Sequence, residues 1–232
     1  MSSRGATAPE TALIVFARAP VPGRVKTRLV PVLGRERAAS LHARLVERTL
    51  RTALAAGFDD VILCCTPAPK GRFFEAMKKQ FGIRLSSQGR GDLGQRMHRA
   101  LSRHPGAVLI GSDCPALRRA DLRAAARALR SGLDAVFSPA EDGGYALIGT
   151  RLSARALFAG VHWGGAKVMA QTRVRLRRLG WHWKELRSVW DVDRPVDLER
   201  LRRSRRLAPL AALPPAAKPR RTSSAARRRA AP

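Results

Sequence analysis

The sequence predicts one α/β domain in which helices cover both faces of a mixed, mainly parallel sheet, a three-layer α/β/α architecture. Short apolar runs alternate with amphipathic helical segments over most of the chain, as in strands joined by crossover helices. Gly, Pro and charged residues gather where these runs end. The chain of 232 residues is 45% hydrophobic, which is enough for one core of this kind.

The elements follow from periodicity in chain order. Residues 11–17 form a continuous apolar run of strand formers, and Pro20, Pro22 and Gly23 predict a loop after it. Residues 35–56 repeat apolar side chains at helical spacing up to Gly57, which predicts a long helix. The same criteria predict further strands at 61–65, 83–85, 107–110, 135–138, 145–149 and 182–186. Further helices are predicted at 73–81, 168–179 and 195–206. Another helix is predicted to end at residue 104, and one more to begin with Asp121 as its N-cap.

The domain is predicted to span residues 11–203. Residues 1–10 are small and polar, and residues 204–232 form a basic Ala/Pro/Arg tail without periodicity, so both ends are expected to be disordered. The sequence shows neither a secretory apolar segment nor a membrane-spanning run, and its three cysteines have no disulfide or zinc spacing. We therefore expect a cytoplasmic protein.

The net charge of +28 raises nucleic acid as a partner. Many of these bases lie on the predicted polar faces of helices or in the tail, and aromatic side chains do not alternate with them. A basic surface that helps to capture phosphorylated ligands is the weaker and preferred interpretation. Contact between the tail and nucleic acid stays open as a secondary role.

A basic loop follows the first predicted strand. It carries Arg18, Arg24, Lys26 and Arg28, with Gly23 allowing close backbone approach. Ligands of parallel sheets bind at the carboxyl ends of the strands, so these side chains are placed to bind several phosphate oxygens. A solvated basic loop is the alternative, and the loop lacks the spacing of a P-loop.

Asp113 directly follows the predicted strand 107–110. A strand-end carboxylate beside a basic loop is suited to a magnesium or manganese ion that bridges to a diphosphate, although such an Asp also serves as a turn or helix cap. Asp191 and Asp193 lie two residues apart in an extended segment and could supply a second carboxylate. Asp197 is explained by capping of the helix that Pro195 begins.

Two glycine-rich turns complete the candidate site. Glu141 and Asp142 precede Gly143 and Gly144, and both acids, Asp142 above all, are candidates to hold a sugar hydroxyl or remove its proton. The glycines also fit a simple hairpin turn. The second turn, at the start of a helix, is predicted to contact a nucleotide base or to be a plain connection. It contains Asp92, Gly94 and Arg96.

Five segments in this order resemble a bacterial family of A-type glycosyltransferase-like proteins, some of which are named as arsenosugar-biosynthesis glycosyltransferases. The segments are Phe16 to Leu29, Gly91 to Met97, Gly111 to Pro115, Asp142 to Tyr145 and Asp191 to Pro195, and the resemblance covers about residues 11–203. That family is similar to the wider nucleotide-diphospho-sugar transferases, which include the molybdenum-cofactor and 2-phospholactate guanylyltransferases.

The resemblance implies a divalent metal at Asp113, phosphate contacts from Arg24, Lys26 and Arg28, and base recognition around Arg18 and residues 92–96. The closing Asp-x-Asp motif, through Asp193, is similar to one that meets the metal in nucleotidyltransferases. This chain departs from many relatives after Trp163, where Gly164 and Gly165 replace a Thr and an Asp, and it lacks an Asp-x-Asp at the first metal position.

The favoured hypothesis is a metal-dependent glycosyltransferase that binds a nucleotide sugar and transfers the glycosyl group to a small acceptor. Lys26 and Asp142 are its catalytic candidates. The first alternative is a guanylyltransferase-like nucleotidyltransferase that condenses a nucleoside triphosphate with a phosphorylated acceptor. The second is a catalytically inactive, basic nucleic-acid-binding protein.

Overall fold

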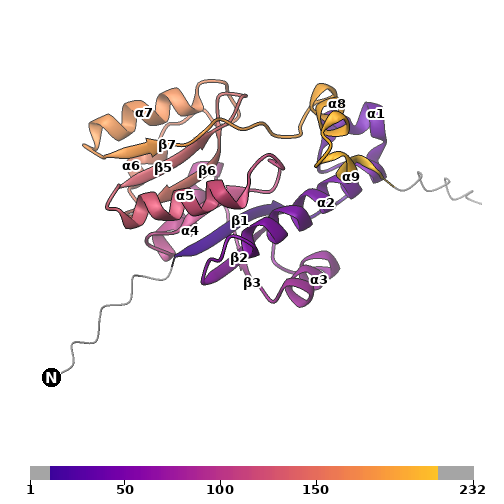
Figure 1. Cartoon of the computed structure of the whole chain (residues 1–232), viewed down its shortest axis with the longest axis horizontal. Coiled ribbons are helices and arrows are strands. Elements are labelled where there is room, and N and C mark those ends of the chain that lie inside the picture. Colours follow the sequence, from indigo (N-terminus) through magenta and orange to yellow (C-terminus); the bar gives the residue numbers. More distant parts are fainter. Residues whose placement is uncertain (1–10, 214–232) are drawn as a thin grey trace, which may run out of the picture.

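The structure, a computed structural model, describes residues 11–213. Seven strands form one sheet in the order β3-β2-β1-β4-β6-β5-β7. All neighbours pair in parallel except β6, which is antiparallel to both β4 and β5. Figure 1 shows the strands at the centre of the molecule with helices around them. The predicted fold class, a mixed and mainly parallel three-layer α/β/α domain, is therefore confirmed.

The strands lie close to their predicted positions. Their bounds are β1 Ala12–Arg18, β2 Asp60–Thr66, β3 Arg84–Ser87, β4 Val108–Gly111, β5 Ala135–Pro139, β6 Tyr145–Thr150 and β7 Trp183–Glu185. The central strands β1, β2 and β4 are apolar on both faces because both faces are covered.

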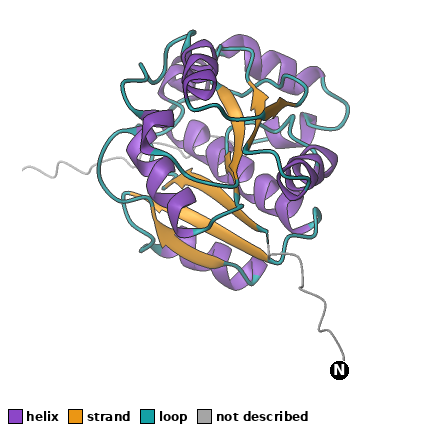
Figure 2. Ribbon diagram, turned by 90° about the vertical axis from the view of Figure 1, so that its left-hand side faces the viewer, coloured by secondary structure: helices purple, strands orange, loops and turns teal. Residues whose placement is uncertain are grey.

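One face of the sheet packs against three helices, α2 (Arg35–Leu54), α3 (Arg72–Phe81) and α5 (Arg119–Arg130). Their buried side chains meet the inward side chains of β1, β2 and β4 in one core. Figure 2 shows helices on both sides of the twisted strands. Burial of these apolar stripes is the main force that holds this layer to the sheet.

The other face packs against α4 (Leu93–Arg103), α6 (Arg155–Phe158) and α7 (Val168–Arg178). Met97 and Leu101 of α4, together with Met169 and Leu176 of α7, contact the opposite side chains of the strands. The short helix α6 was not predicted from periodicity, because four residues do not complete a recognisable pattern.

A third cluster lies beyond the carboxyl end of β1. It joins η1 (Thr27–Leu29), α1 (Val30–Leu33), α2, α8 (Pro195–Arg203) and α9 (Ala208–Ala211). Residues 204–213 were predicted to begin a disordered tail, but Leu207 is buried and Arg44 donates to the carbonyl of Pro209. This part of the boundary prediction was wrong because packing against α2, rather than helical periodicity, orders the segment.

The predicted start of one helix and the predicted ends of the chain can also be compared with the structure. Asp121 was predicted as an N-cap, but it is the third residue of α5 and accepts from the backbone N–H of Arg118. The predictions for residues 1–10 and 214–232 lie outside the described residues. Within residues 11–213, no helix has the length and apolar character needed to cross a membrane.

Candidate functional site

Lys26 lies in the loop after β1 and is buried, with 7% of its surface exposed. Its backbone is left-handed, with φ at 49°, the only such non-glycine residue between residues 11 and 213. This sparsely populated conformation is costly unless the surroundings impose it. The side chain is held accordingly, because Nζ donates to the carbonyl of Val192 at 2.6 Å. Lys26 is thus a fixed charge.

Asp113 meets Lys26 although the two belong to different loops. Asp113 follows β4, and its Oδ1 lies 2.7 Å from Lys26 Nζ. The two loops are joined through a third segment, since the backbone N–H of Val192 donates to the carbonyl of Asp113 at 3.0 Å. The predicted convergence of the basic loop with the Asp113 loop is therefore present in the structure.

His42 of α2 completes this contact. Its Nδ1 lies 3.4 Å from Asp113 Oδ1, and its Nε2 is 3.0 Å from the carbonyl oxygen of Arg18. Asp113 Oδ1 is buried, yet the side chain as a whole is 48% exposed, so the rest of the carboxyl faces open space. Burial acts to raise the pKa of Asp113, but the charge of Lys26 and the contact with His42 outweigh it and hold that pKa well below its usual range.

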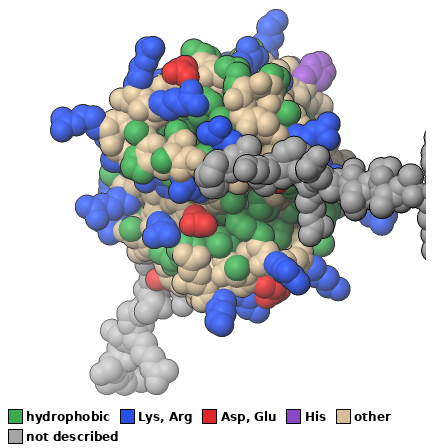
Figure 3. Space-filling view, turned by 90° about the vertical axis from the view of Figure 1, so that its right-hand side faces the viewer, with side chains coloured by type: hydrophobic (Ala, Val, Ile, Leu, Met, Phe, Trp, Pro, Cys, Tyr) green, Lys and Arg blue, Asp and Glu red, His purple; other side chains and the backbone are tan. Residues whose placement is uncertain are grey.

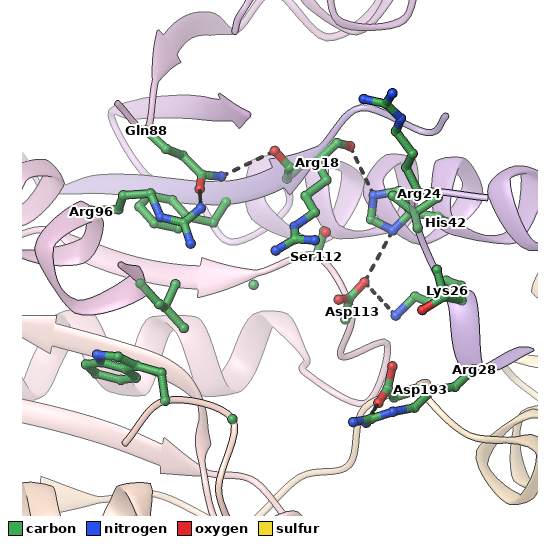
Figure 4. A pocket seen from close by; sticks show the side chains of 18 residues that line it. Arg18, Arg24, Lys26, Arg28, His42, Gln88, Arg96, Ser112, Asp113 and Asp193 are labelled. Atoms are coloured by element: carbon green, nitrogen blue, oxygen red, sulfur yellow. Dashed lines mark hydrogen bonds and ion pairs between the residues drawn. The ribbon is translucent and has the colours of Figure 1, made fainter. Parts of the chain in front are cut away.

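A cavity of about 680 Å³ opens beside this cluster. Its basic lining residues are Arg18, Arg24, Lys26, Arg28, His42 and Arg96. In Figure 4 the Arg18 guanidinium points into the cavity, whereas the Arg24 side chain points away from Asp113. Figure 3 views the molecule from the end where α1, α8 and α9 lie in Figure 1, and Lys and Arg side chains are spread over this face among few Asp and Glu.

Gln88 lies just after β3, is buried and forms part of the inner wall of this cavity. Its Nε2 donates to the carbonyl of Cys64 at 2.9 Å, and its Oε1 accepts from Arg96 at 3.0 Å. Burial, and then the nearby charge of Arg18, lowers the pKa of Arg96. The positive guanidinium groups of Arg18 and Arg96 together favour an anionic ligand between them.

A second, smaller cavity of about 220 Å³ adjoins the first and shares Asp113, Leu93 and Trp163 with it. Its acidic lining residues are Asp113, Asp142 and Asp191, and its wall is apolar and aromatic, with Tyr145 and Trp163 edge to face at 6.4 Å between ring centroids. Asp142 Oδ1 accepts from the backbone N–H of Gly144 at 2.9 Å. The structure thus places the predicted Asp142 at the second cavity.

Asp191 lies among like charges. Burial raises its pKa to about 6, and the carboxylates of Asp142 and Asp113 add to the rise while Lys26 opposes it. Neighbouring carboxylates that repel one another in this way form an environment that a cation would relieve.

Asp193, predicted as a metal ligand with Asp113, is paired with Arg28. It lines the larger cavity, whereas Asp191 lines the smaller one. Among residues 11–213, no three His, Cys, Asp or Glu side chains are grouped as a ready-made metal site. Asp197 caps α8 as predicted, accepting from the backbone N–H groups of Asp193 and Arg194 at 3.0 and 2.7 Å.

Several predicted contact residues have structural roles instead and do not line the larger cavity. Asp92 caps α4 through a capping box with Gln95. Gly94 makes room for Trp163, since a Cβ there would lie 2.6 Å from the indole. Gly143 has a φ of +88° and a backbone approach to Ala166 that a Cβ would block at 2.0 Å. Gly23, with a φ of +75°, shapes the basic loop, and Gly144 lines only the smaller cavity.

Sequence reasoning missed His42 and the part played by Trp163. His42 was assigned no role, although it shares the buried face of α2 with Leu41 and Leu45, where an imidazole needs a polar partner. Gln88 belongs to the glycine-rich turn whose backbone amides were predicted to contact a base, and the structure places its buried side chain in the lining of the larger cavity. Trp163 reaches the site only through packing on Gly94, which no local pattern reveals.

Comparisons with known proteins identify the family and agree with the fold. Residues 49–165 match the family described as "Uncharacterized protein conserved in bacteria (DUF2064)". A protein of Desulfovibrio desulfuricans G20, provisionally named a nucleotide-diphospho-sugar transferase, is similar at 31% identity and a TM-score of 0.76, over 87% of this chain and 94% of that one. No curated protein matches the chain in sequence.

Two more distant structures share the fold. Glucosyl-3-phosphoglycerate synthase of Mycobacterium tuberculosis, in complex with Mn²⁺, UDP and glucosyl-3-phosphoglycerate, is similar at 15% identity and a TM-score of 0.50, over 87% of this chain and 81% of that one. A CMP:2-keto-3-deoxy-manno-octonic acid synthetase complexed with CTP is similar at 14% identity and a TM-score of 0.52, over 83% and 97%. At these identities the likeness concerns the fold alone.

Proposed function

The chain belongs to the bacterial protein family DUF2064, and we propose that it is a metal-dependent glycosyltransferase that transfers a sugar from a nucleotide-sugar donor to a small acceptor. One observation carries the proposal. Lys26 and Asp113 are joined at 2.7 Å where a basic cavity meets an acidic one. A donor with an anionic diphosphate suits the first cavity, and an acceptor suits the second.

The larger cavity has the volume of a typical nucleotide site. We place the donor nucleotide along Arg18, Gln88 and Arg96, with its diphosphate toward Lys26 and Arg28. Arg24 points away from Asp113 and belongs to the outer edge of this site. Predicted donor contacts from Gly23, Asp92, Gly94 and Gly143 are not part of the proposal, because none of them lines this cavity.

The donor set fits a hard divalent cation such as Mg²⁺ or Mn²⁺. Asp113 uses its buried Oδ1 for Lys26 and His42, so the other oxygen is open to the cavity. Asp191 is a better second ligand than Asp193, because Asp193 is paired with Arg28 and Asp191 lies in the field of Asp113. When bound, such an ion would neutralise charge on the diphosphate.

The residues of this chain then have distinct tasks. Transfer breaks the bond between the sugar carbon and the diphosphate oxygen and forms a bond from that carbon to the acceptor oxygen. Lys26, held in place by Val192, stabilises the charge on the departing nucleoside diphosphate without moving. Asp142 orients the acceptor hydroxyl and takes its proton; this role is supported by its position in the lining of the second cavity, where we put the acceptor.

Product analysis tests the proposal against its alternatives. Full-length protein with Mn²⁺ is expected to release a nucleoside diphosphate from at least one nucleotide sugar. Pyrophosphate release from a nucleoside triphosphate and a phosphorylated acceptor would instead identify a nucleotidyltransferase. Salt-sensitive DNA binding without turnover of either donor class would support the nucleic-acid-binding alternative.

A thermal-shift screen of nucleotides and nucleotide sugars would identify the base before any turnover assay. A ligand that binds only the folded protein raises its melting temperature.

A further inference from the structure

The two cavities at the site differ in the charge of their lining. The larger one is mainly basic, with Asp113 and Asp193 as its acidic residues, and the smaller one is acidic. The larger one is lined by Arg18, Arg24, Lys26, Arg28 and Arg96. The smaller one is lined by Asp113, Asp142 and Asp191, and no Lys, Arg or His of the described residues lines it. The separation is therefore a property of the site and not of the strongly basic chain as a whole.

The negative charge of the smaller cavity decides which acceptors it can bind. A phosphate group in a small cavity bordered by three carboxylates would be desolvated and repelled without a basic partner. A divalent cation does not reverse this, because its two positive charges also face the diphosphate of the donor. Uncharged hydroxyl groups can donate to the carboxylates, and an ammonium group would be attracted to them.

The uncharged part of the wall of the smaller cavity indicates the size and shape of the acceptor. Tyr145, Trp163, Met97 and Val168 form an apolar and aromatic surface, and the volume of about 220 Å³ corresponds to a molecule of roughly monosaccharide size. Aromatic faces suit the C–H surface of a polyol or sugar ring, while the carboxylates face its hydroxyl groups.

We infer that the acceptor is a small polyol, sugar or amino-polyol without a phosphate group, bound in the cavity between Asp142, Asp191 and the Tyr145–Trp163 pair. This inference rests on the proposed glycosyltransferase function and specifies its substrate class. It also separates that function from the nucleotidyltransferase alternative, which requires a phosphorylated acceptor.

The experiment compares matched acceptors on the full chain with Mn²⁺ and a nucleoside diphosphate. The pairs are glycerol with glycerol 3-phosphate, and glucose or glucosamine with glucose 6-phosphate. Binding is measured by saturation-transfer NMR in competition, and nucleoside diphosphate release is measured separately with a nucleotide sugar. The phosphorylated member of each pair is expected to bind at least about tenfold more weakly.

The two readouts keep the two claims apart. Equal or tighter binding of the phosphorylated members would overturn the acceptor inference, whatever the turnover. Failure to release nucleoside diphosphate from any donor would count against the proposed function, while the binding preference still tests the cavity.

A charge-insertion variant adds a second test. Leu93 lines both cavities and is 36% exposed, so its replacement spares the core. Leu93→Lys is expected to improve the ratio of phosphorylated to uncharged acceptor binding several-fold, whereas Leu93→Gln, its control of similar length, is expected to leave the ratio unchanged. Because the readout is a ratio, a general loss of affinity cancels. An unchanged ratio in Leu93→Lys would contradict the inference.

Discussion

Lys26 Nζ and Asp113 Oδ1 lie 2.7 Å apart. The segment 190–193 holds them there, because the carbonyl of Val192 accepts from the lysine side chain and its backbone N–H donates to the carbonyl of Asp113. Three segments distant in sequence are thus joined at one point. The proposed chemistry depends on this contact, so the first prediction concerns it.

Lys26→Met is expected to lower kcat/KM for the nucleotide sugar by roughly 10²-fold or more, because a prearranged charge at the leaving group is lost. Steady-state kinetics measures this, with circular dichroism to show that the fold is kept. Arg24→Met is the control, since Arg24 lines the same cavity but points away from Asp113. Equal losses in the two variants would mean that net positive charge, and not the fixed lysine, matters.

Mn²⁺ is expected to raise the melting temperature of the wild-type protein in the presence of a nucleoside diphosphate, because a ligand of the folded state stabilises it. Asp113→Asn and Asp191→Asn should lose most of this shift, while Asp193→Asn should keep it, since Asp193 is paired with Arg28. Differential scanning fluorimetry checks the series. A shift that disappears in Asp193→Asn and persists in Asp191→Asn would restore Asp193 as the second ligand.

Without metal, the contribution of Asp191 to the free energy of unfolding is expected to fall as pH rises from about 4 to about 6. The raised pKa of Asp191, about 6 against an ordinary 3.8, means that the folded state binds the proton more tightly than the unfolded state in this window. Urea unfolding at both pH values, with a chelator present, should show that raising the pH stabilises Asp191→Asn more than the wild type, or destabilises it less, by about 1–3 kcal/mol. Parallel pH profiles for the two proteins would refute this.

Gly143→Ala is expected to destabilise the protein by more than Gly132→Ala, by at least about 1 kcal/mol. Both glycines have positive φ, at +88° and +95°, so both variants carry backbone strain. Only at Gly143 would the added Cβ also meet backbone, at 2.0 Å from the carbonyl oxygen of Ala166, whereas nothing lies within 4 Å at Gly132. Chemical denaturation measures the difference, and equal losses would show that the 166 loop moves aside freely.

The sequence was sufficient to predict the fold class, because the central strands are continuous apolar runs and the long covering helices have an apolar stripe. It also predicted the edge of the sheet where the site lies, since Arg18, Asp113 and Asp142 all follow strands. These are local signals, and burial requires them wherever a strand is covered on both faces. The capping role of Asp197 was predictable for the same reason.

The tertiary structure alone decided which of these residues meet. Asp191 and Asp193 are equivalent by spacing, but packing of their segment against Asp113 and Lys26 pairs one with Arg28 and places the other beside Asp142. Glycines with similar sequence surroundings likewise have different reasons for lacking a side chain. Gly94 makes room for Trp163, and Gly143 makes room for the backbone of Ala166. Such assignments depend on distances between segments far apart along the chain, and local periodicity carries no information about those distances.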